Sequence, residues 1–290
     1  MELGQLSALA AAVSEGTFDA AARRLHVTPS AISQRIKALE TSVGQVLMTR
    51  SKPVRPTPGG EAVLRLARQV EALTEDTLAE IGASTGDRGV AVVPLAVNAD
   101  SLATWFPAAL AAAGPGLAFD VRRDDQERTA DLLREGTVMA AVTSVPDPVP
   151  GCSVRRLGRM RYHAAAAEPF AARWFAGGAT TEALLAAPVV VYDRTDRLQD
   201  RYLRRRTRRR PTGPRHYLPD TNAFVQGVGR GLGWGMLLDE QIAALPEPPR
   251  RLDPARTVDV VLYWQQWRLR SAALDAVAAA VRNTAERLLV

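Results

Sequence analysis

Short polar side chains and one lysine recur between residues 28 and 43 at a spacing that gathers them on one side of a helix. At roughly 100° per residue, Ser30, Gln34 and Lys37 project within about 40° of one another, and Ser33 lies beside them. Hydroxyl, amide and ammonium groups form hydrogen bonds with base edges in a major groove. This face holds no large apolar residue and no acid, so it suits DNA better than a partner helix.

The elements that must position this face form a predicted winged helix-turn-helix. The opposite side of the same helix carries Ile32, Ile36 and Leu39 at helical spacing. Thr28 is expected to cap the helix, because its hydroxyl can accept from a free backbone N–H group of the first turn. The predicted elements are a helix from Leu3 that Gly16 ends, a helix over Phe18–Leu25, a helix over Thr28–Val43 that Gly44 ends, and a basic β-wing between Val46 and Val54.

Within this module the sequence predicts two kinds of DNA contact. Ser33, Gln34 and Lys37 are expected to read base edges, and neighbouring side chains to grip phosphates. Arg35 lies on the flank near the core and suits either role. The alternative is a merely solvated face, against which the capped start, the turn and the wing all argue. The expected phosphate contacts are Ser30, Arg50, Lys52, Arg55 and Thr57.

A long helix is predicted after the wing. Thr57 and Pro58 open it, and an apolar stripe from Val63 to Ile81 carries it to about Ser84. Because an isolated helix of this length must bury its stripe, the expected partner is the same helix of a second copy. The charge reverses here: residues 1–60 hold seven basic and four acidic side chains, whereas residues 61–88 hold three and six.

The composition limits the class of protein. A chain of 290 residues, 47% apolar, supports about two domains, and its formal charge of +6 favours a nucleic-acid partner. One cysteine allows no internal disulfide, and with three histidines it argues against a structural zinc site. The N-terminus lacks a signal-peptide pattern, and no apolar run is long enough to span a membrane. We therefore expect a cytoplasmic protein without a membrane partner.

No catalytic or cofactor-binding pattern is present in the sequence. No serine or cysteine pairs with a histidine at the spacing of a known catalytic motif. The glycine-rich segment 227–235 fails the spacing of a dinucleotide-binding loop and lacks the lysine that ends a phosphate-binding loop. We therefore expect neither an enzyme nor a bound cofactor or metal.

From Val90 onward, short apolar runs alternate with helical patterns. This alternation predicts an α/β fold with a largely parallel sheet. The expected helices are Ser101–Ala113, Thr129–Glu135 and Ser271–Leu288. The expected strands include Val90–Val97, Leu117–Arg122, Met139–Thr143, Val189–Tyr192, Met236–Leu238 and Val258–Trp264.

Five linked motifs in the first 60 residues resemble the N-terminal domain of LysR-type transcriptional regulators. They are Ala20–Leu25, Thr28–Ser33, Ile36–Glu40, Gly44-x-x-Leu47-x-x-Arg50 and Thr57-x-x-Gly60. One departure is Met48, where the family usually has phenylalanine, and this exchange keeps an apolar core residue. The resemblance implies a DNA-binding regulator that assembles as a homotetramer from two dimers.

Further segments resemble the lysine- and arginine-responsive subgroup of this family, the ArgP/IciA and LysG type. They include Val97–Pro107, Asp124-Asp125-x-x-Arg128-Thr129, Ala140–Thr143, Ala223–Gln226 and Tyr263-Trp264. The resemblance implies an effector domain of two periplasmic-binding-protein-like subdomains with a ligand site between them. The expected boundaries are residues 1–58 for the DNA-binding domain, 59–89 for the linker helix and hinge, and 90–290 for the effector domain, with subdomain I at about 90–162 and 267–290 and subdomain II at about 163–266.

Candidate effector contacts follow strands or begin helices in this region. Ser101 and Thr104 are expected to hold the α-carboxylate of an amino acid, because unpaired N–H groups at a helix start favour an anion. Asp100 is more simply a helix cap, and Asp124 and Asp125 are either a solvated turn or the partners of a cationic side chain, which we favour for at least one of them. Further wall residues are Thr143, Tyr192, Asp193, Thr221, Asn222 and Trp264.

The helix-turn-helix pattern predicts a protein that binds a double-stranded operator. The resemblance implies, in addition, a regulator that responds to L-lysine or L-arginine, contacts RNA polymerase and activates an exporter gene for basic amino acids. The alternative is an architectural or replication-inhibiting protein that binds curved A·T-rich DNA without a ligand. One feature fits neither reading: the segment 201–215 contains eight arginines and no acid. It is either a solvated face or an additional surface for DNA or polymerase.

Overall fold

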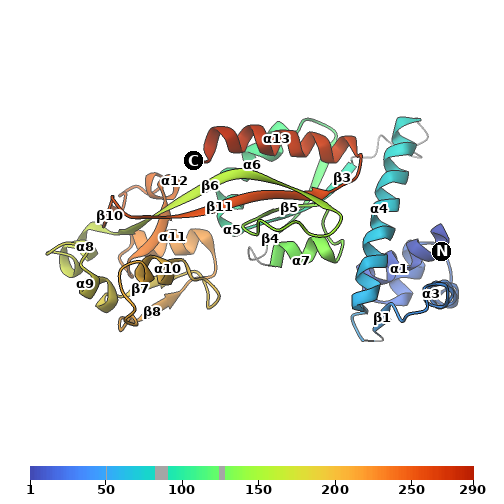
Figure 1. Ribbon diagram of the computed structural model, residues 1–290, viewed down its shortest axis with the longest axis horizontal. Coiled ribbons are helices and arrows are strands. Elements are labelled where there is room, and N and C mark those ends of the chain that lie inside the picture. The colour runs from blue at the N-terminus through green and yellow to red at the C-terminus, as the bar shows by residue number, and fades with distance from the viewer. Residues whose placement is uncertain (50, 82–90, 124–127) are drawn as a thin grey trace. The chain divides into compact units, whose positions relative to one another are not determined.

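The computed structural model describes residues 1–49, 51–81, 91–123 and 128–290 (Figure 1). Three residues with predicted roles, Arg50, Asp124 and Asp125, lie outside these ranges. Backbone contacts divide the chain into two compact units. The first comprises Met1–Asn98, Leu110–Arg155 and Trp264–Val281, and the second comprises Ala99–Ala109, Arg156–Tyr263 and Arg282–Val290.

The three N-terminal helices form where the sequence predicts them. They are α1 (Leu3–Glu15), α2 (Phe18–Arg24) and α3 (Pro29–Val43). The hydroxyls of Thr17 and Thr28 each accept a hydrogen bond, at 3.2 Å, from the backbone N–H three residues later, so Thr17 caps α2 and the predicted cap at Thr28 is confirmed. Gly44 ends α3 with a φ of 74°, in the left-handed region that glycine adopts without strain.

These helices, the wing and the start of the next helix share one apolar core. The wing is β1 (Met48–Thr49), paired antiparallel with β2 (Arg55–Pro56), and α4 (Pro58–Glu80) follows it. Glu40 Oε1 accepts from the backbone N–H of Leu47 at 2.9 Å, so the end of α3 is tied to the start of the wing. The core includes Leu6, Leu9, Ile32, Ile36, Leu39, Leu47 and Leu64.

Three strands of the first unit are parallel, as the alternating pattern predicts. They are β3 (Ala91–Val97), β4 (Leu117–Arg123) and β5 (Ala140–Thr143), in the order β4-β3-β5. Leu95 pairs with Val121 on one side and with Ala140 on the other. Parallel neighbours require crossover connections, and α7 (Arg128–Arg134) lies in the connection between β4 and β5.

The rest of the sheet is mixed, which corrects the prediction of a largely parallel sheet. Its order is β10-β6-β11-β5-β3-β4, with β9 also paired to β6. β9 (Gly235–Leu238) and β10 (Arg250–Arg251) pair antiparallel with the long β6 (Cys152–Ala166). The sequence did not reveal β6, because four arginines interrupt its apolar pattern. β11 (Thr257–Trp267) lies between β6 and β5.

The helix predicted over Ser101–Ala113 is instead two helices, α5 (Ala99–Ala103) and α6 (Phe106–Ala112). Pro107 accounts for the break, because it has no N–H to donate to the last turn of α5. The remaining elements are α8 (Glu168–Trp174), α9 (Thr181–Ala186), β7 (Val189–Val191), α10 (Leu198–Arg204), β8 (Arg215–Tyr217), which is parallel to β7, α11 (Thr221–Gly229), α12 (Asp239–Ala243) and α13 (Ala272–Leu288).

The first turn of α4 packs closely against the backbone that leads into the wing, and this contact can be tested. A Cβ added at Gly60 would lie 1.8 Å from the carbonyl oxygen of Leu47, so Gly60→Ala should destabilise the N-terminal module by about 3 kcal/mol. Hydrogen–deuterium exchange should show lost protection in α1–α4 with protection of β3 unchanged. Gly59→Ala is the matched control, since its Cβ would meet only the movable side-chain oxygen of Gln45. Equal protection in both variants would contradict this packing.

Candidate functional site

The outward face of α3 is built as a recognition surface requires. Ser33, Gln34 and Lys37 are exposed, and within the described residues their side chains have no hydrogen-bond or ion-pair partner. The hydroxyl of Ser30 lies 2.9 Å from that of Thr28, beside the capped helix start. Buried Ile32, Ile36 and Leu39 hold the opposite side of the helix in the core. The polar groups predicted to read bases are therefore free to meet a ligand.

Two other predicted DNA contacts have structural roles in this arrangement. The guanidinium of Arg35 packs beside the start of α1, 3.8 Å from the position that a Cβ on Gly4 would occupy. The hydroxyl of Thr57 donates to the carbonyl of Val46 at 2.8 Å and accepts from the N–H of Gly60 at 3.1 Å, so it caps α4. A phosphate contact by Thr57 would compete with these bonds.

The wing presents its basic side chains outward. Lys52 and Arg55 are both exposed. The turn between the wing strands is held by its own hydroxyls: Ser51 donates to the carbonyl of Pro53 at 2.8 Å, and Thr49 donates to that of Arg55 at 3.1 Å. Together with the α3 face, the wing supplies the mixture of hydrogen-bonding and cationic groups that DNA binding needs.

In the second unit, Asp100 is the centre of a partly buried polar cluster. Its carboxylate accepts from the hydroxyl of Tyr162 at 2.7 Å and from Nε2 of Gln241 at 3.2 Å. Burial raises the pKa of the Asp100 carboxyl against the effect of these two hydrogen bonds, and the charge of Asp196 raises it further. Asp100 lies inside the first turn of α5 and bonds to distant side chains, so it differs from the simple helix cap expected from the sequence.

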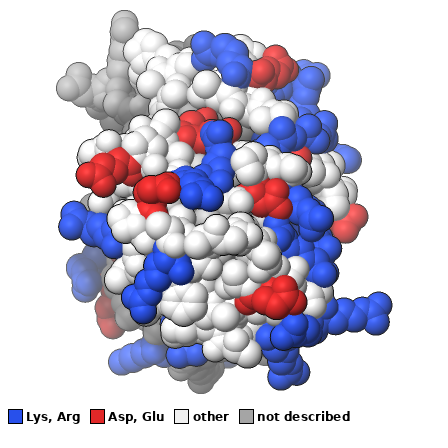
Figure 2. Space-filling view, turned by 90° about the vertical axis from the view of Figure 1, so that its left-hand side faces the viewer, with Lys and Arg blue, Asp and Glu red and all other residues white. Residues whose placement is uncertain are grey.

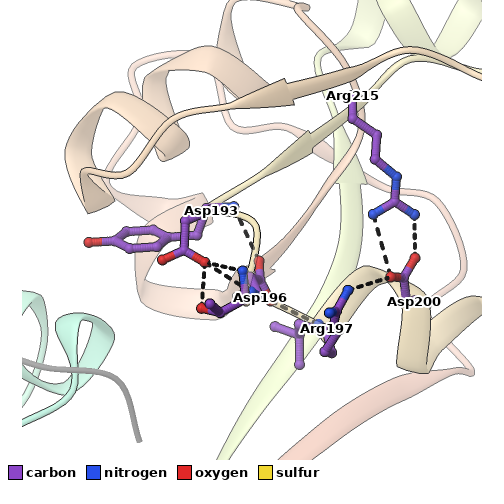
Figure 3. Close-up of polar contacts among 8 residues, drawn as sticks. Asp193, Asp196, Arg197, Asp200 and Arg215 are labelled. Atoms are coloured by element: carbon purple, nitrogen blue, oxygen red, sulfur yellow. Dashed lines mark hydrogen bonds and ion pairs between the residues drawn. The ribbon is translucent and has the colours of Figure 1, made fainter. Parts of the chain in front are cut away.

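A second carboxylate, Asp196, lies in the turn that follows β7 (Figure 3). It accepts from the backbone N–H groups of Tyr192 at 3.2 Å and Leu198 at 2.8 Å. Burial raises the pKa of Asp196 despite these bonds, and the neighbouring charge of Asp193 adds to the rise. The second unit thus contains two carboxylates whose ionised forms are each destabilised by loss of water.

Asp193 is different in character. It accepts from the N–H and hydroxyl of Thr195, both at 2.7 Å, and from the N–H of Asp196 at 3.0 Å. Burial acts to raise the pKa of Asp193, but these three hydrogen bonds outweigh it, so the pKa lies below its ordinary value. Asp193 therefore shapes the turn and stays ionised.

The other predicted effector residues occupy varied positions. Ser101 is fully buried, with its hydroxyl 3.5 Å from the sulfur of Met160, and the Thr104 hydroxyl donates to the carbonyl of Asp100 at 2.7 Å. In the second unit, Thr221 and Asn222 open α11, which Asp220 caps. In the first unit, Thr143 is buried at the end of β5, and the indole N–H of buried Trp264 donates to Gln266 at 2.6 Å.

Sequence reasoning missed Asp196, Tyr162 and Gln241. No local motif marks them, because they come from a turn, a strand and a helix that only the fold brings to Asp100. Tyr162 lies in β6, which the sequence did not reveal. Its pKa is raised well above the ordinary value by burial and by the Asp100 charge, so it remains a hydrogen-bond donor.

Comparison with known proteins decides the family. The model for the bacterial regulatory helix-turn-helix protein, lysR family, matches residues 3–61, and the LysR substrate binding domain matches residues 87–286. The chain belongs to the LysR family of transcriptional regulators. The predicted fold class and the prediction of a regulator rather than an enzyme are thereby confirmed.

Proteins of this family match the chain over almost its whole length. The HTH-type transcriptional regulator LysG of Mycobacterium tuberculosis is 47% identical over 286 residues, 98% of this chain and 93% of that protein. The lysine export transcriptional regulatory protein LysG of Corynebacterium glutamicum is 38% identical over 289 residues, 97% of each chain. The solved structure of full-length LysG from C. glutamicum with bound effector Arg gives a TM-score of 0.83 at 34% identity, covering 100% of this chain and 99% of that one.

Among the residues that the structure describes, no group of three or more His, Cys, Asp or Glu side chains is placed to hold a metal ion. None of the described helices is long and apolar enough to cross a membrane.

The division between base and phosphate contacts can be tested on α3 and the wing. Gln34→Ala should reduce the preference for the operator over unrelated DNA, with about 1–3 kcal/mol of discrimination lost. Lys52→Ala should instead weaken binding to every sequence and lower the slope of log K against log salt by about 0.9. Fluorescence anisotropy over a salt series measures both effects. The assignment fails if Gln34→Ala weakens all sequences equally.

Proposed function

We propose that this LysR-family regulator responds to L-lysine or L-arginine and activates an exporter gene for basic amino acids in the cytoplasm. Two relatives support the proposal: one is named for lysine export, and one solved structure holds arginine as effector. The observation that carries it is the presence of two partly buried carboxylates, Asp100 and Asp196, since two carboxylates that are costly to ionise alone favour a cationic ligand.

In this proposal, the cationic side chain of the ligand lies next to Asp100 and Asp196. A guanidinium or ammonium group near Asp100 and Asp196 would offset the loss of water that raises their pKa values. Two residues before Asp100 in the sequence, the buried side-chain oxygen of Asn98 has no hydrogen-bond partner among the described residues. A buried acceptor without a donor is uncommon in folded proteins, and a ligand N–H would satisfy it.

The predicted contacts from the sequence remain part of this proposal. Thr104 has acceptor capacity left after its bond to Asp100 and can turn toward a ligand. Asp124 and Asp125 are retained as further cation partners by resemblance. We retain as wall residues Ser101, Thr143, Tyr192, Asp193, Thr221, Asn222 and Trp264.

Self-association is proposed through α4. The exposed large apolar side chains on this helix are Leu66, Leu73 and Leu78, and Ile81 follows directly after its end. Exposed apolar stripes on long helices are normally buried by a partner. A second copy of α4 would cover the stripe in a homodimer, and two dimers would form the homotetramer. The other proposed partners are the double-stranded operator and RNA polymerase.

The carboxylate pair predicts a specific pH dependence. A bound cation favours the ionised carboxylates, so binding should release protons, and affinity should fall as the pH drops through the raised pKa values. Asp100→Asn and Asp196→Asn should each weaken L-arginine binding about 10- to 100-fold. Calorimetry in buffers of different ionisation enthalpy measures both affinity and proton release.

Stability separates a ligand role from a structural one in these variants. Because the folded-state pKa of Asp100 is raised, its ionised form costs stability above that pKa, whereas Asp100→Asn keeps only one acceptor oxygen for the donors Tyr162 and Gln241. These two effects oppose each other, so the thermal midpoint at neutral pH should change little. Glu168→Gln, at an exposed carboxylate of α8, is the matched control and should bind normally. Unchanged arginine binding in both aspartate variants would rule out this pair.

The regulatory proposal is tested on the DNA upstream of the regulator's own gene. L-lysine or L-arginine should change the DNase footprint, because an effector acts only through a difference in affinity between two states. A neutral isostere such as L-norleucine should leave the footprint unchanged. A footprint insensitive to all three would favour the ligand-independent architectural protein.

A further inference from the structure

The arginine-rich segment 197–215 divides into arginines that stabilise the fold and arginines that do not. Arg206 forms an ion pair with Asp253 and donates to Ala179 at 2.7 Å, and Arg215 pairs with Asp200. Both guanidinium groups are largely buried. Arg205 donates to the carbonyl of Thr257 at 2.8 Å, and Arg209 pairs with Glu182 at 3.3 Å. These contacts fix the backbone of the segment.

Arg197 is exposed and lies 4.0 Å from Asp200. The remaining four arginines have no such role. Arg201, Arg204, Arg208 and Arg210 are exposed, and among the described residues their side chains have no ion-pair or hydrogen-bond partner. Arg201 and Arg204 are three residues apart on α10, so they lie on one side of the helix, opposite buried Tyr202 and Leu203. We call these four residues the free-arginine patch.

The acidic side chains around this segment already form ion pairs with its arginines. The segment 197–215 and its ion-pair partners contain nine arginines and three acids, Glu182, Asp200 and Asp253. Six positive charges are left over, which equals the formal charge of the whole chain. Figure 2, which views one face of the molecule, likewise shows more Lys and Arg surface than Asp and Glu surface. This segment therefore carries a local excess of positive charge, larger than the +3 of residues 1–60.

We propose that the free-arginine patch binds the phosphate backbone of double-stranded DNA, as a second, sequence-independent contact in addition to the helix-turn-helix. Guanidinium groups bind phosphate oxygens in a bidentate manner. An acidic protein would be the other polyanion, but protein interfaces depend on buried apolar or aromatic anchors. The segment 197–215 contains none of the exposed large apolar side chains of the described residues, and the exposed Tyr217 just beyond it is already covered by the guanidinium of Arg194, 4.9 Å from its ring centroid.

Anchoring favours this contact further. Because Arg205 and Arg206 are tied to neighbouring elements, the backbone just before Arg208 and Arg210 is held in place before DNA arrives. Less conformational entropy is then lost on binding than for a flexible basic tail.

The test uses the full-length protein and a 60-base-pair duplex of mixed sequence, with affinity measured by fluorescence anisotropy from low to moderate salt. The variant R201A/R204A/R208A/R210A should lower the slope of log K against log salt by about 2 to 4, at about 0.9 for each lost phosphate contact. The control R155A/R156A/R173A/R230A removes the same charge from exposed, scattered sites and should change the slope by less than about 0.5.

The outcomes are distinct. The proposal is supported if the slope of log K against log salt falls more in the patch variant than in the control. A version of the patch with four lysines should restore most of that slope. Equal losses in both variants would reduce the effect to net charge and overturn the proposal. An unchanged slope in the patch variant would also overturn it and would direct attention to an acidic protein partner. Circular dichroism of each variant establishes that the fold is intact.

Discussion

The second unit is organised around a carboxylate that it keeps largely out of water. Tyr162 from β6 and Gln241 from α12 both donate to Asp100, so three segments distant in the sequence meet at two oxygen atoms. Two hydrogen bonds do not replace full hydration, which is why the pKa of Asp100 stays above its ordinary value. The unit therefore holds its strands and helices together with a group whose charge is not fully compensated. A neutral ligand would leave that imbalance unchanged, whereas a cation would remove it.

Arginine serves opposite purposes within one short stretch of this chain. Arg206 and Arg215 are compensated by buried acids and join neighbouring elements, and the loss of either acid would leave a buried cation alone. The free-arginine patch has no such acids and remains hydrated at little cost. From composition alone the two groups look identical. Only the positions of Asp200 and Asp253 separate arginines that stabilise the fold from those available to a partner.

How much could be predicted depended on how local the determining interactions were. The helices of the DNA-binding module follow from caps and apolar spacing within a few residues, as Thr28 and Gly44 illustrate. β6 was missed because its arginines hide the alternation, and with it went Tyr162. Asp100 was recognised, but its role could not be, because its partners lie 62 and 141 residues away in the sequence. Asp196 belongs to a turn with no motif at all.

The two candidate sites also differ in what binding must change. The side chains on the outer face of α3 have no internal partners, so DNA can bind them without breaking any bond of the fold. Asp100 and Asp196 already hold hydrogen bonds from β6, α12 and the turn after β7. A ligand at these carboxylates must compete with those bonds or displace a proton. Binding there is consequently coupled to the packing of the elements that donate them, which is the property a regulatory site needs and a recognition surface does not.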